Sequence, residues 1–289
     1  MPVFETPGPI AATVDVFVGE VRVVAGERTD TVVEVRPTDP ARAADVKAAE
    51  ETLVELSGGG LVVRRPRRWR ALGPSGRSGS VDVVVELPAG SRLTGDLAMG
   101  SFRTTGTLGD SRLKTGLGDI EIDEAATVTL SSSAGDVSVG RATGDARLTT
   151  ASGAVRAGEI GGSAVVKSSN GDCRVDAAGG ELHVRSANGD IVVGHARGSV
   201  SAATANGAVR IAVVERGRVA AATGFGPVEV GIATGTAAWL DLTTGHGQLH
   251  NALEGGGPPE PGEERVEVRA RTGLGDITIR RAVPEESLA

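Results

Sequence analysis

The stretch KSSNGDCRVDAAGGELHVRSANGDIVV, residues 167–193, contains one pattern twice. The tripeptide Asn-Gly-Asp at 170–172 returns eighteen residues later, at 188–190. After each copy, small or apolar residues occupy every second position, as in a strand with one buried face. The stretch therefore predicts a structural unit of about 18 residues that repeats along the chain.

The glycine of this tripeptide marks the same place in successive units. It recurs at steps of 17 to 19 residues from residue 100 to residue 226, and then at steps of 21 and 28 residues. The ten positions, called the anchor glycines below, are Gly100, Gly118, Gly135, Gly153, Gly171, Gly189, Gly207, Gly226, Gly247 and Gly275. The insertion GGGPPEPGEE at 255–264 accounts for the longest step, and the pattern is expected to resume after it.

A second glycine lies halfway through several units and divides each into two arms of about nine residues. These glycines are Gly144, Gly162, Gly180 and Gly198. The apolar residues of both arms follow period two, and we expect them to point inward. In the first arms they are Val137, Val139, Val155, Ala157, Cys173, Val175, Ile191, Val193, Val209 and Ile211. In the second arms they are Ala146, Leu148, Ala164, Val166, Leu182, Val184, Val200, Ala202, Val219 and Ala221.

A single arm cannot bury its apolar face, so successive units must stack. Stacking them in register, about 4.8 Å apart, pairs each strand with its equivalent in the next unit and closes a continuous core. The repeat therefore predicts an all-β fold, a parallel β-solenoid in which each unit forms one rung. A β-propeller would need repeats of about 40 residues.

Composition narrows the classes of protein further. Glycine supplies 43 of 289 residues, aromatic residues only 2 %, and tyrosine is absent, so the predicted core is thin and built from small aliphatic side chains. The formal net charge of −7 disfavours nucleic acid as a partner, because attraction to phosphates needs a basic surface. The single cysteine excludes an intrachain disulfide.

Residues 1–95 show no such repeat and are expected to form a β-rich cap that merges into the first rungs. Strands are expected at 12–18, 20–25, 31–36, 52–56, 60–63 and 81–87. One short helix is expected near 39–50, with Asp39 as its N-cap before Pro40. The solenoid is then expected over 96–283, followed by a frayed tail at 284–289.

The aspartate after the anchor glycine has two interpretations. As in the calcium β-roll, a column of carboxylates could bind Ca²⁺, which prefers six to eight oxygen ligands. The position is, however, acidic only at Asp119, Asp136, Asp172, Asp190 and Asp276. Other residues interrupt it at Ala154, Ala208, Pro227 and Gln248. A tight corner that uses glycine for its backbone freedom is the favoured interpretation.

The strongest charge run is RRPRRWR at 64–70. Its basic residues are Arg64, Arg65, Arg67 and Arg68, with Trp69 as an aromatic neighbour. They suit either a solvated loop, which is the favoured interpretation, or a patch that contacts an anionic surface.

Residues with catalytic or metal-binding chemistry do not form a recognisable motif. His183, His195, His246 and His250 lack the spacing of a zinc site. Cys173 lies on the inward face and is expected to pack rather than react. The insertion contributes Glu260, Glu263 and Glu264 but no neighbouring histidine or lysine, which disfavours a polysaccharide-processing β-helix enzyme. We therefore predict no catalytic, cofactor-binding or metal-binding residues and no cofactor.

With the repeat in place, the chain resembles the bacterial toast-rack, or DUF4097, family. The resemblance rests on residues 79–122, on DPARAADVKAAEETLVELSGGGLVV at 39–63, and on the recurring NGD, SGA and TGLGDI corners. It implies a right-handed, single-stranded β-helix and an adhesin-like, non-catalytic protein. Some relatives are linked to cell-envelope stress, and the family supplies no catalytic residues.

Taken together, the sequence predicts a structural scaffold that binds another protein or associates with itself along the rod. A calcium-binding or surface-binding module is the alternative, and an enzyme is less favoured. MPVFETPGPI at the start lacks the features of a secretory signal, and no apolar run approaches the length of a membrane span, so a cytoplasmic location is expected.

Overall fold

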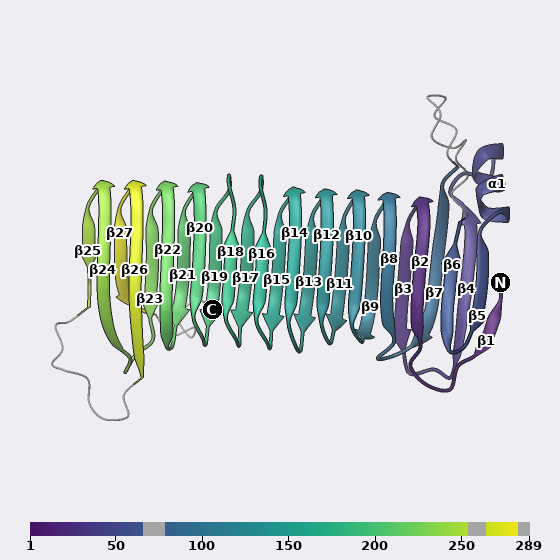
Figure 1. Cartoon of the computed structure of the whole chain (residues 1–289), viewed down its shortest axis with the longest axis horizontal. Helices are drawn as coiled ribbons and strands as arrows, with labels where there is room; N and C mark the ends of the chain where they lie inside the picture. The colour runs from purple at the N-terminus through teal and green to yellow at the C-terminus, as the bar shows by residue number, and fades with distance from the viewer. Residues whose placement is uncertain (66–78, 254–263, 283–289) are drawn as a thin grey trace, which may run out of the picture. The chain divides into compact units, whose positions relative to one another are not determined.

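The computed structural model describes residues 1–65, 79–253 and 264–282, which form strands β1 to β27 and helix α1 (Figure 1). The chain divides into two compact units, Met1–Ala142 (unit 1) and Thr143–Ala289 (unit 2). Within each unit, long strands lie side by side in two sheets, and most neighbours run parallel. The predicted all-β parallel solenoid is therefore confirmed.

Unit 1 contains two sheets that share its rungs. One sheet has the order β1-β4-β7-β3-β9-β11-β13 and the other the order β12-β10-β8-β2-β6-β5. The first consists of β1 (Val3–Glu5), β4 (Asp30–Pro37), β7 (Val81–Pro88), β3 (Val21–Gly26), β9 (Phe102–Leu108), β11 (Ile120–Ala125) and β13 (Val137–Ala142). The second consists of β12 (Val128–Ala134), β10 (Ser111–Leu117), β8 (Arg92–Met99), β2 (Ala11–Val18), β6 (Gly60–Arg64) and β5 (Leu53–Ser57). The outer strands β1, β4 and β5 pair antiparallel to their neighbours and give this end of unit 1 an atypical edge.

The N-terminal residues already contain a complete rung, which was not predicted from the repeat. β2 and β3 form a rung that pairs with β6 and β7 on one side and with β8 and β9 on the other. Its corner is at Gly19, with φ of 150°, as at the anchor glycines. The expected strands before residue 95 are all present, and the boundary there stays a prediction.

The helix is shorter than expected at its start. α1 spans Ala43–Glu50, with Arg42 at the N-cap and no side-chain capping bond. Asp39 instead closes the preceding turn, where its carboxylate accepts the N–H of Ala41 at 2.9 Å. The expected N-cap role of Asp39 was therefore wrong, because the chain makes a separate turn before the helix begins.

Unit 2 repeats the same arrangement. Its sheets have the orders β15-β17-β19-β21-β23-β27-β25 and β24-β26-β22-β20-β18-β16-β14. The first consists of β15 (Val155–Ile160), β17 (Cys173–Ala178), β19 (Ile191–Ala196), β21 (Val209–Val214), β23 (Val228–Ile232), β27 (Ile277–Arg281) and β25 (Leu249–Asn251). The second consists of β24 (Ala237–His246), β26 (Arg265–Leu274), β22 (Gly217–Phe225), β20 (Val200–Asn206), β18 (Leu182–Arg185), β16 (Ala164–Lys167) and β14 (Ala146–Ser152).

The last rungs of unit 2 are not stacked in the order of the sequence. β26 pairs with both β22 and β24, and β27 pairs with both β23 and β25. The final rung, β26–β27, is therefore inserted between the two rungs that precede it. The rung β24–β25, residues 237–251, forms the end of the stack and is called the end rung below.

The core of both units follows the alternation expected from the sequence. All twenty residues predicted to face inward in the arms between 137 and 221 are buried. The side chain of Val184 is 0 % exposed, whereas the neighbouring Arg185 is exposed. Stacked aliphatic side chains thus supply the apolar burial that stabilises each unit. In the part of the chain that the structure describes, no helix has the length and hydropathy required to span a bilayer.

Candidate interaction surface

The geometry of the corner explains why glycine recurs at the same place in successive rungs. At the ten anchor glycines φ lies between 133° and 154°, a region that L-residues rarely adopt. Space is equally restrictive, because a Cβ on Gly171 would lie 2.0 Å from the carbonyl oxygen of Gly153. A Cβ on Gly189 would lie 2.3 Å from the carbonyl oxygen of Gly171. The anchor glycines therefore allow rungs to approach to hydrogen-bonding distance at the corner.

The aspartates that follow the anchor glycines connect one rung to the next. Asp172 accepts the N–H of Asp190 at 2.8 Å, and Asp190 accepts the N–H of Ala208 at 2.8 Å. Asp119 and Asp276 make the same 2.8 Å bond to Asp136 and Gln248. Within the described residues, no three Asp, Glu, His or Cys side chains gather as metal ligands. These contacts support a structural role for the aspartates.

Hydroxyl and amide side chains reinforce the same corners. Three residues before an anchor glycine, a serine or threonine hydroxyl donates to the carbonyl oxygen of a neighbouring anchor glycine, at 2.8 to 3.3 Å. The donors are Thr115, Ser132, Ser168, Ser186, Thr204, Thr223, Thr244 and Thr272. Asn188 donates to Asn170 at 2.9 Å, and Asn206 donates to Asn188 at 2.8 Å. The polar groups of the corners thus bond mainly to one another.

The residue just before each corner glycine projects outward, and together these residues form a column that we call the ridge. In unit 1 the ridge is apolar and consists of Val18, Met99, Leu117 and Ala134, which are aligned in register. Met99 and Leu117 are each 48 % exposed. Adjacent exposed apolar side chains of this size mark sites of interaction more often than isolated ones do.

In unit 2 the ridge changes character along its length. It begins with Ser152 and three asparagines, Asn170, Asn188 and Asn206. It then continues with Phe225, Leu274 and His246, again in register. Phe225 is 61 % exposed and Leu274 is 54 % exposed. The ridge was not predicted from the sequence, although aligning the residue before each anchor glycine shows the column.

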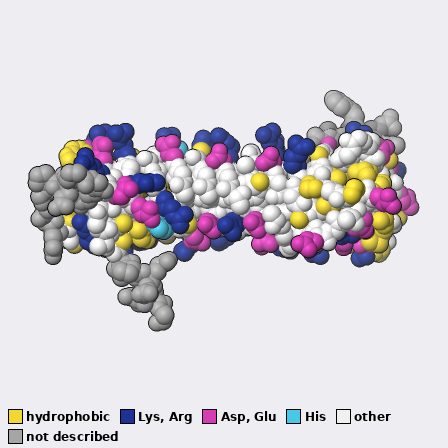
Figure 2. Space-filling model, turned by 90° about the horizontal axis from the view of Figure 1, so that it is seen from below, with side chains coloured by type: hydrophobic (Ala, Val, Ile, Leu, Met, Phe, Trp, Pro, Cys, Tyr) yellow, Lys and Arg dark blue, Asp and Glu magenta, His cyan; other side chains and the backbone are white. Residues whose placement is uncertain are grey.

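The surface outside the ridge carries charges of both signs. In Figure 2, basic and acidic side chains lie close together, with much uncharged polar surface and backbone between them. Several of these charges pair between neighbouring rungs, such as Arg103 with Glu121 at 2.9 Å and Arg218 with Glu267 at 3.1 Å. Exposed pairs of this kind contribute little to stability, and they leave this surface without a strong field of one sign.

Within the described residues, the histidine, cysteine and glutamate side chains considered in the sequence analysis are dispersed. Burial raises the pKa of the Cys173 thiol to about 12, with the Asp172 carboxylate adding to the shift, so the thiol stays protonated at neutral pH. His183 lies 3.1 Å from Glu181, and His195 lies 2.7 Å from Glu215. The His183 pair is exposed, the His195 pair is partly buried, and the two histidines lie on different strands. His246 and His250 are exposed and lie in the end rung itself. Glu264 pairs with Arg216 at 3.3 Å, whereas Glu260 and Glu263 lie outside the described residues.

The arginine run is only partly within the described chain. The Arg65 guanidinium donates to the carbonyl oxygen of Gly79 at 2.9 Å and lies 3.7 Å from the Glu51 carboxylate. Its side chain is 15 % exposed, so Arg65 supports the fold and has little surface left for an anionic partner. Arg64 is exposed and lies beside Asp15 in register. Arg67 and Arg68 lie outside the described residues.

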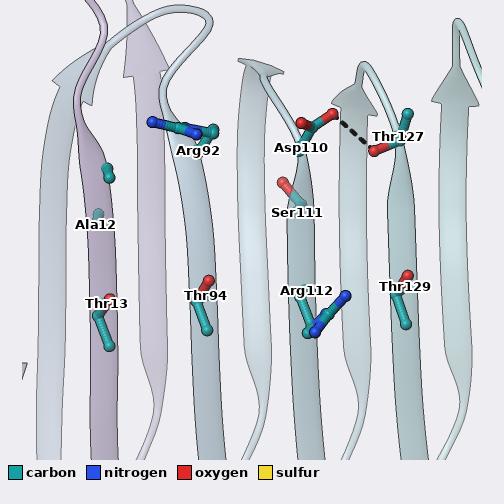
Figure 3. A pocket seen from close by; sticks show the side chains of 10 residues that line it. Ala12, Thr13, Arg92, Thr94, Asp110, Ser111, Arg112, Thr127 and Thr129 are labelled. Carbon is teal, nitrogen blue, oxygen red and sulfur yellow. Dashed lines mark hydrogen bonds between the residues drawn. The ribbon is translucent and has the colours of Figure 1, made fainter.

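A shallow hollow of about 400 Å³ lies on the outer face of β2, β8, β10 and β12 in unit 1 (Figure 3). Its lining includes Arg92, Thr94, Asp110 and Arg112. Asp110 accepts a hydrogen bond from the Thr127 hydroxyl at 2.7 Å. Figure 3 shows Arg92 and Arg112 extending away from each other, so they do not converge on one point. The hollow is polar and open and lacks the convergent groups of a catalytic centre.

Comparison with known proteins identified similar solved structures. One is a "putative adhesin" from Parabacteroides merdae, with a TM-score of 0.45 and 10 % identity, covering 98 % of this chain and 95 % of that chain. Another is a "putative adhesin" from Bacteroides fragilis, with a TM-score of 0.43 and 12 % identity, covering 96 % and 95 %. A "putative lipid binding protein" from Parabacteroides distasonis has a TM-score of 0.30 and 13 % identity, covering 98 % and 96 %.

No curated protein matches the chain. The family model described as Toastrack DUF4097 matches residues 19–236, which is most of the chain and begins at the corner glycine Gly19. The match covers most of the glycine corners and the ladders that connect them. The chain therefore belongs to the Toastrack DUF4097 family.

Proposed function

We propose that this protein is a non-catalytic, adhesin-like scaffold that binds another protein through the ridge. The observation that carries the proposal is the apolar column of unit 1, where Met99 and Leu117 lie side by side and half exposed. Stacked rungs hold these side chains at a fixed spacing, so a partner meets a preorganised surface. A preorganised surface reduces the entropy lost on binding, which suits a scaffold.

The chemistry of the corners supports this proposal over the alternatives. The Asp172 and Asp190 carboxylates already accept backbone N–H groups, which weakens the case for a calcium ladder. An enzyme would need convergent acid, base or nucleophilic groups, and the described histidine pairs lie on separate strands. A link to cell-envelope stress draws its support from the family resemblance alone.

Site-specific photo-crosslinking in the source organism tests the proposal. A benzophenone amino acid is placed at Leu117 on the ridge and, as the matched control, at Arg112 on the outer face of the same strand, β10. We expect one discrete protein partner, identified by mass spectrometry, to crosslink at position 117 and not at position 112. Adding Met99→Ser to the Leu117 probe variant should abolish that crosslink, because it removes half of the apolar contact.

Two results would contradict the proposal. Equal crosslinking at both positions would indicate non-specific contact with the sheet face. A crosslink that persists with Met99→Ser would show that the apolar ridge does not hold the partner. Far-UV circular dichroism of each variant verifies that the β-structure is retained.

A further inference from the structure

The end rung of unit 2 has a strand neighbour on one side only. β24 pairs with β26, and β25 pairs with β27. Within the described residues, no strand covers the opposite side of either one. The stack thus ends in an edge that is open in both sheets, and open edges are surfaces on which strands pair.

The inward-facing side chains of the end rung are incompletely buried. In the adjacent rung, Val268 and Ile277 are each 0 % exposed. Their register partners in the end rung are Leu240, which is half-buried, and Leu249, which is 50 % exposed. The apolar layer that other rungs cover on both sides is therefore covered on one side here. Covering its second side would bury more apolar surface and stabilise the contact.

The backbone of β24 is also suited to pairing. Ala237 donates its N–H to Glu264, toward the β26 side. Because N–H and C=O groups alternate in direction along a strand, those of Ala238, Leu240 and Leu242 face the open edge. β24 is ten residues long, AAWLDLTTGH, and contains no proline and no lysine, the residues that commonly blunt an edge.

We propose that this end is the contact between two copies of the chain, which pair their end rungs around a two-fold axis with β24 antiparallel to β24 of the second copy. The edge of β24 is about 33 Å long, and a two-sheet end with its outward side chains is about 20 Å thick. Each copy would therefore bury about 660 Å² of surface at this end. The total for two copies exceeds the ~1,000 Å² of buried surface expected of a specific interface.

A second copy fits this edge better than the other edges of the chain do. Antiparallel pairing needs an open strand of matched length, and β24 supplies its own match. The outer strands of unit 1, β1 and β5, have only three and five residues. The one carboxylate of β24, Asp241, lies 3.8 Å from the Arg271 guanidinium, so pairing two copies does not oppose bare like charges. A closed, two-fold dimer follows.

Sedimentation velocity of the full chain over a range of concentrations tests the dimer. We expect the wild type to reach twice its 29.1 kDa monomer mass. Ala238→Pro removes an edge N–H that does not face β26, and Leu242→Lys places a charge on the half-buried end. Each variant should raise the dimer Kd by at least about tenfold, because both copies carry the change. Thr243→Lys adds the same charge on the outward side of β24 and is the matched control, which should leave the Kd unchanged.

The outcomes separate cleanly. A wild-type chain that stays monomeric at high concentration overturns the proposal and would mean that solvent or the chain's own residues meet the open edge. A dimer insensitive to Ala238→Pro and Leu242→Lys overturns it as well, by assigning the contact to another surface. The ridge proposal stands apart from both results, because crosslinking at Leu117 in unit 1 does not require the end rung.

Discussion

Replacing Gly171 with alanine tests the packing of the corners directly. Gly171 has φ of 141°, and an added Cβ would lie 2.0 Å from the Gly153 carbonyl oxygen and 2.5 Å from its carbon. The clashing atoms belong to the backbone, which cannot move away as a flexible side chain could. Two hydrogen bonds hold this backbone in place: the Gly171 N–H donates to the Asn188 carbonyl oxygen at 2.8 Å, and the Gly153 N–H donates to the Asn170 carbonyl oxygen at 2.9 Å. The two rungs must therefore separate or Gly171 must leave its conformation.

The loss of stability caused by Gly171→Ala has two parts, backbone strain and steric clash, and alanine substitutions at two further glycines separate them. Gly26 has neither a positive φ nor any atom within 4 Å of a built Cβ, so Gly26→Ala should change the free energy of unfolding by less than about 0.5 kcal/mol. Gly235 has φ of 79° with open space around it, so Gly235→Ala isolates backbone strain, about 1 kcal/mol. Gly171→Ala adds the clash, and we expect a loss of at least about 3 kcal/mol.

Urea unfolding followed by far-UV circular dichroism measures the series. With an m-value of about 2 kcal/mol/M for a unit of this size, Gly171→Ala should lower the unfolding midpoint by about 1.5 M. The Gly235→Ala midpoint should fall by about 0.5 M, and that of Gly26→Ala should stay near the wild type. If Gly171→Ala matched Gly26→Ala, rung contact at the corner would not be what requires glycine, and the reasoning would fail.

Three further predictions test the register, the corner aspartates and the rung order. Val184→Asp should lower the free energy of unfolding by several kcal/mol, because it buries an unpaired charge. Arg185→Asp should change that free energy by less than about 0.5 kcal/mol in the same urea assay. Equal effects of the two substitutions would refute the register. Calcium should leave the melting temperature unchanged. Asp190→Ala should lower the free energy of unfolding by about 1 kcal/mol with or without calcium, because the Asp190 carboxylate accepts a backbone N–H. A calcium-dependent rise in the melting temperature that Asp190→Ala abolishes would restore the metal interpretation. Cysteines at Ala222 and Arg271, which are register partners, should oxidise to a disulfide detectable by mass spectrometry. Failure to form that bond would favour a stack in sequence order, where these positions would be two spacings apart.

The parts of the fold that follow from period two could be predicted from the sequence. Cys173, Val184 and the other inward positions were identified because a half-buried strand repeats every second residue and the rung repeats every 18. The outward Arg174 and Arg185 follow from the same rule. The burial pattern thus depends on the local sequence, so it can be predicted without knowing the order of the rungs.

The candidate interaction surface was only partly predictable. Aligning the residues before the anchor glycines would place Met99, Leu117 and Phe225 in one column, but their exposure depends on how each side chain leaves the corner, which the sequence does not show. The function of Arg65 was also hidden, because its partners Glu51 and Gly79 lie on segments that meet only in the folded chain. The start of α1 was misplaced because the turn at Asp39 uses the residues that otherwise cap a helix.

Rung order could not be predicted, because a parallel ladder offers the same backbone hydrogen bonds in any order. What fixes the order is the linker that steps over a rung. Residues 233–236 pass the inserted rung, and two spacings of about 4.8 Å lie well within the reach of four residues. The Arg281 guanidinium, at the end of the inserted rung, donates to the linker carbonyls of Ala233 and Thr236 at 3.0 and 2.8 Å.

Unit 1 uses the same device at its own end. The linker between β7 and β8 passes the rung β2–β3. The Ala89 N–H donates to the carbonyl oxygen of Gly26, in the rung that is passed, at 2.8 Å. The next N–H, that of Gly90, donates to the carbonyl oxygen of Thr107, in the rung β8–β9, at 2.8 Å. In both units a linker crosses a rung and bonds to it, so the crossed rung and the linker stabilise each other. The periodic sequence therefore specifies the rungs, and the short non-periodic linkers specify which rung each one meets.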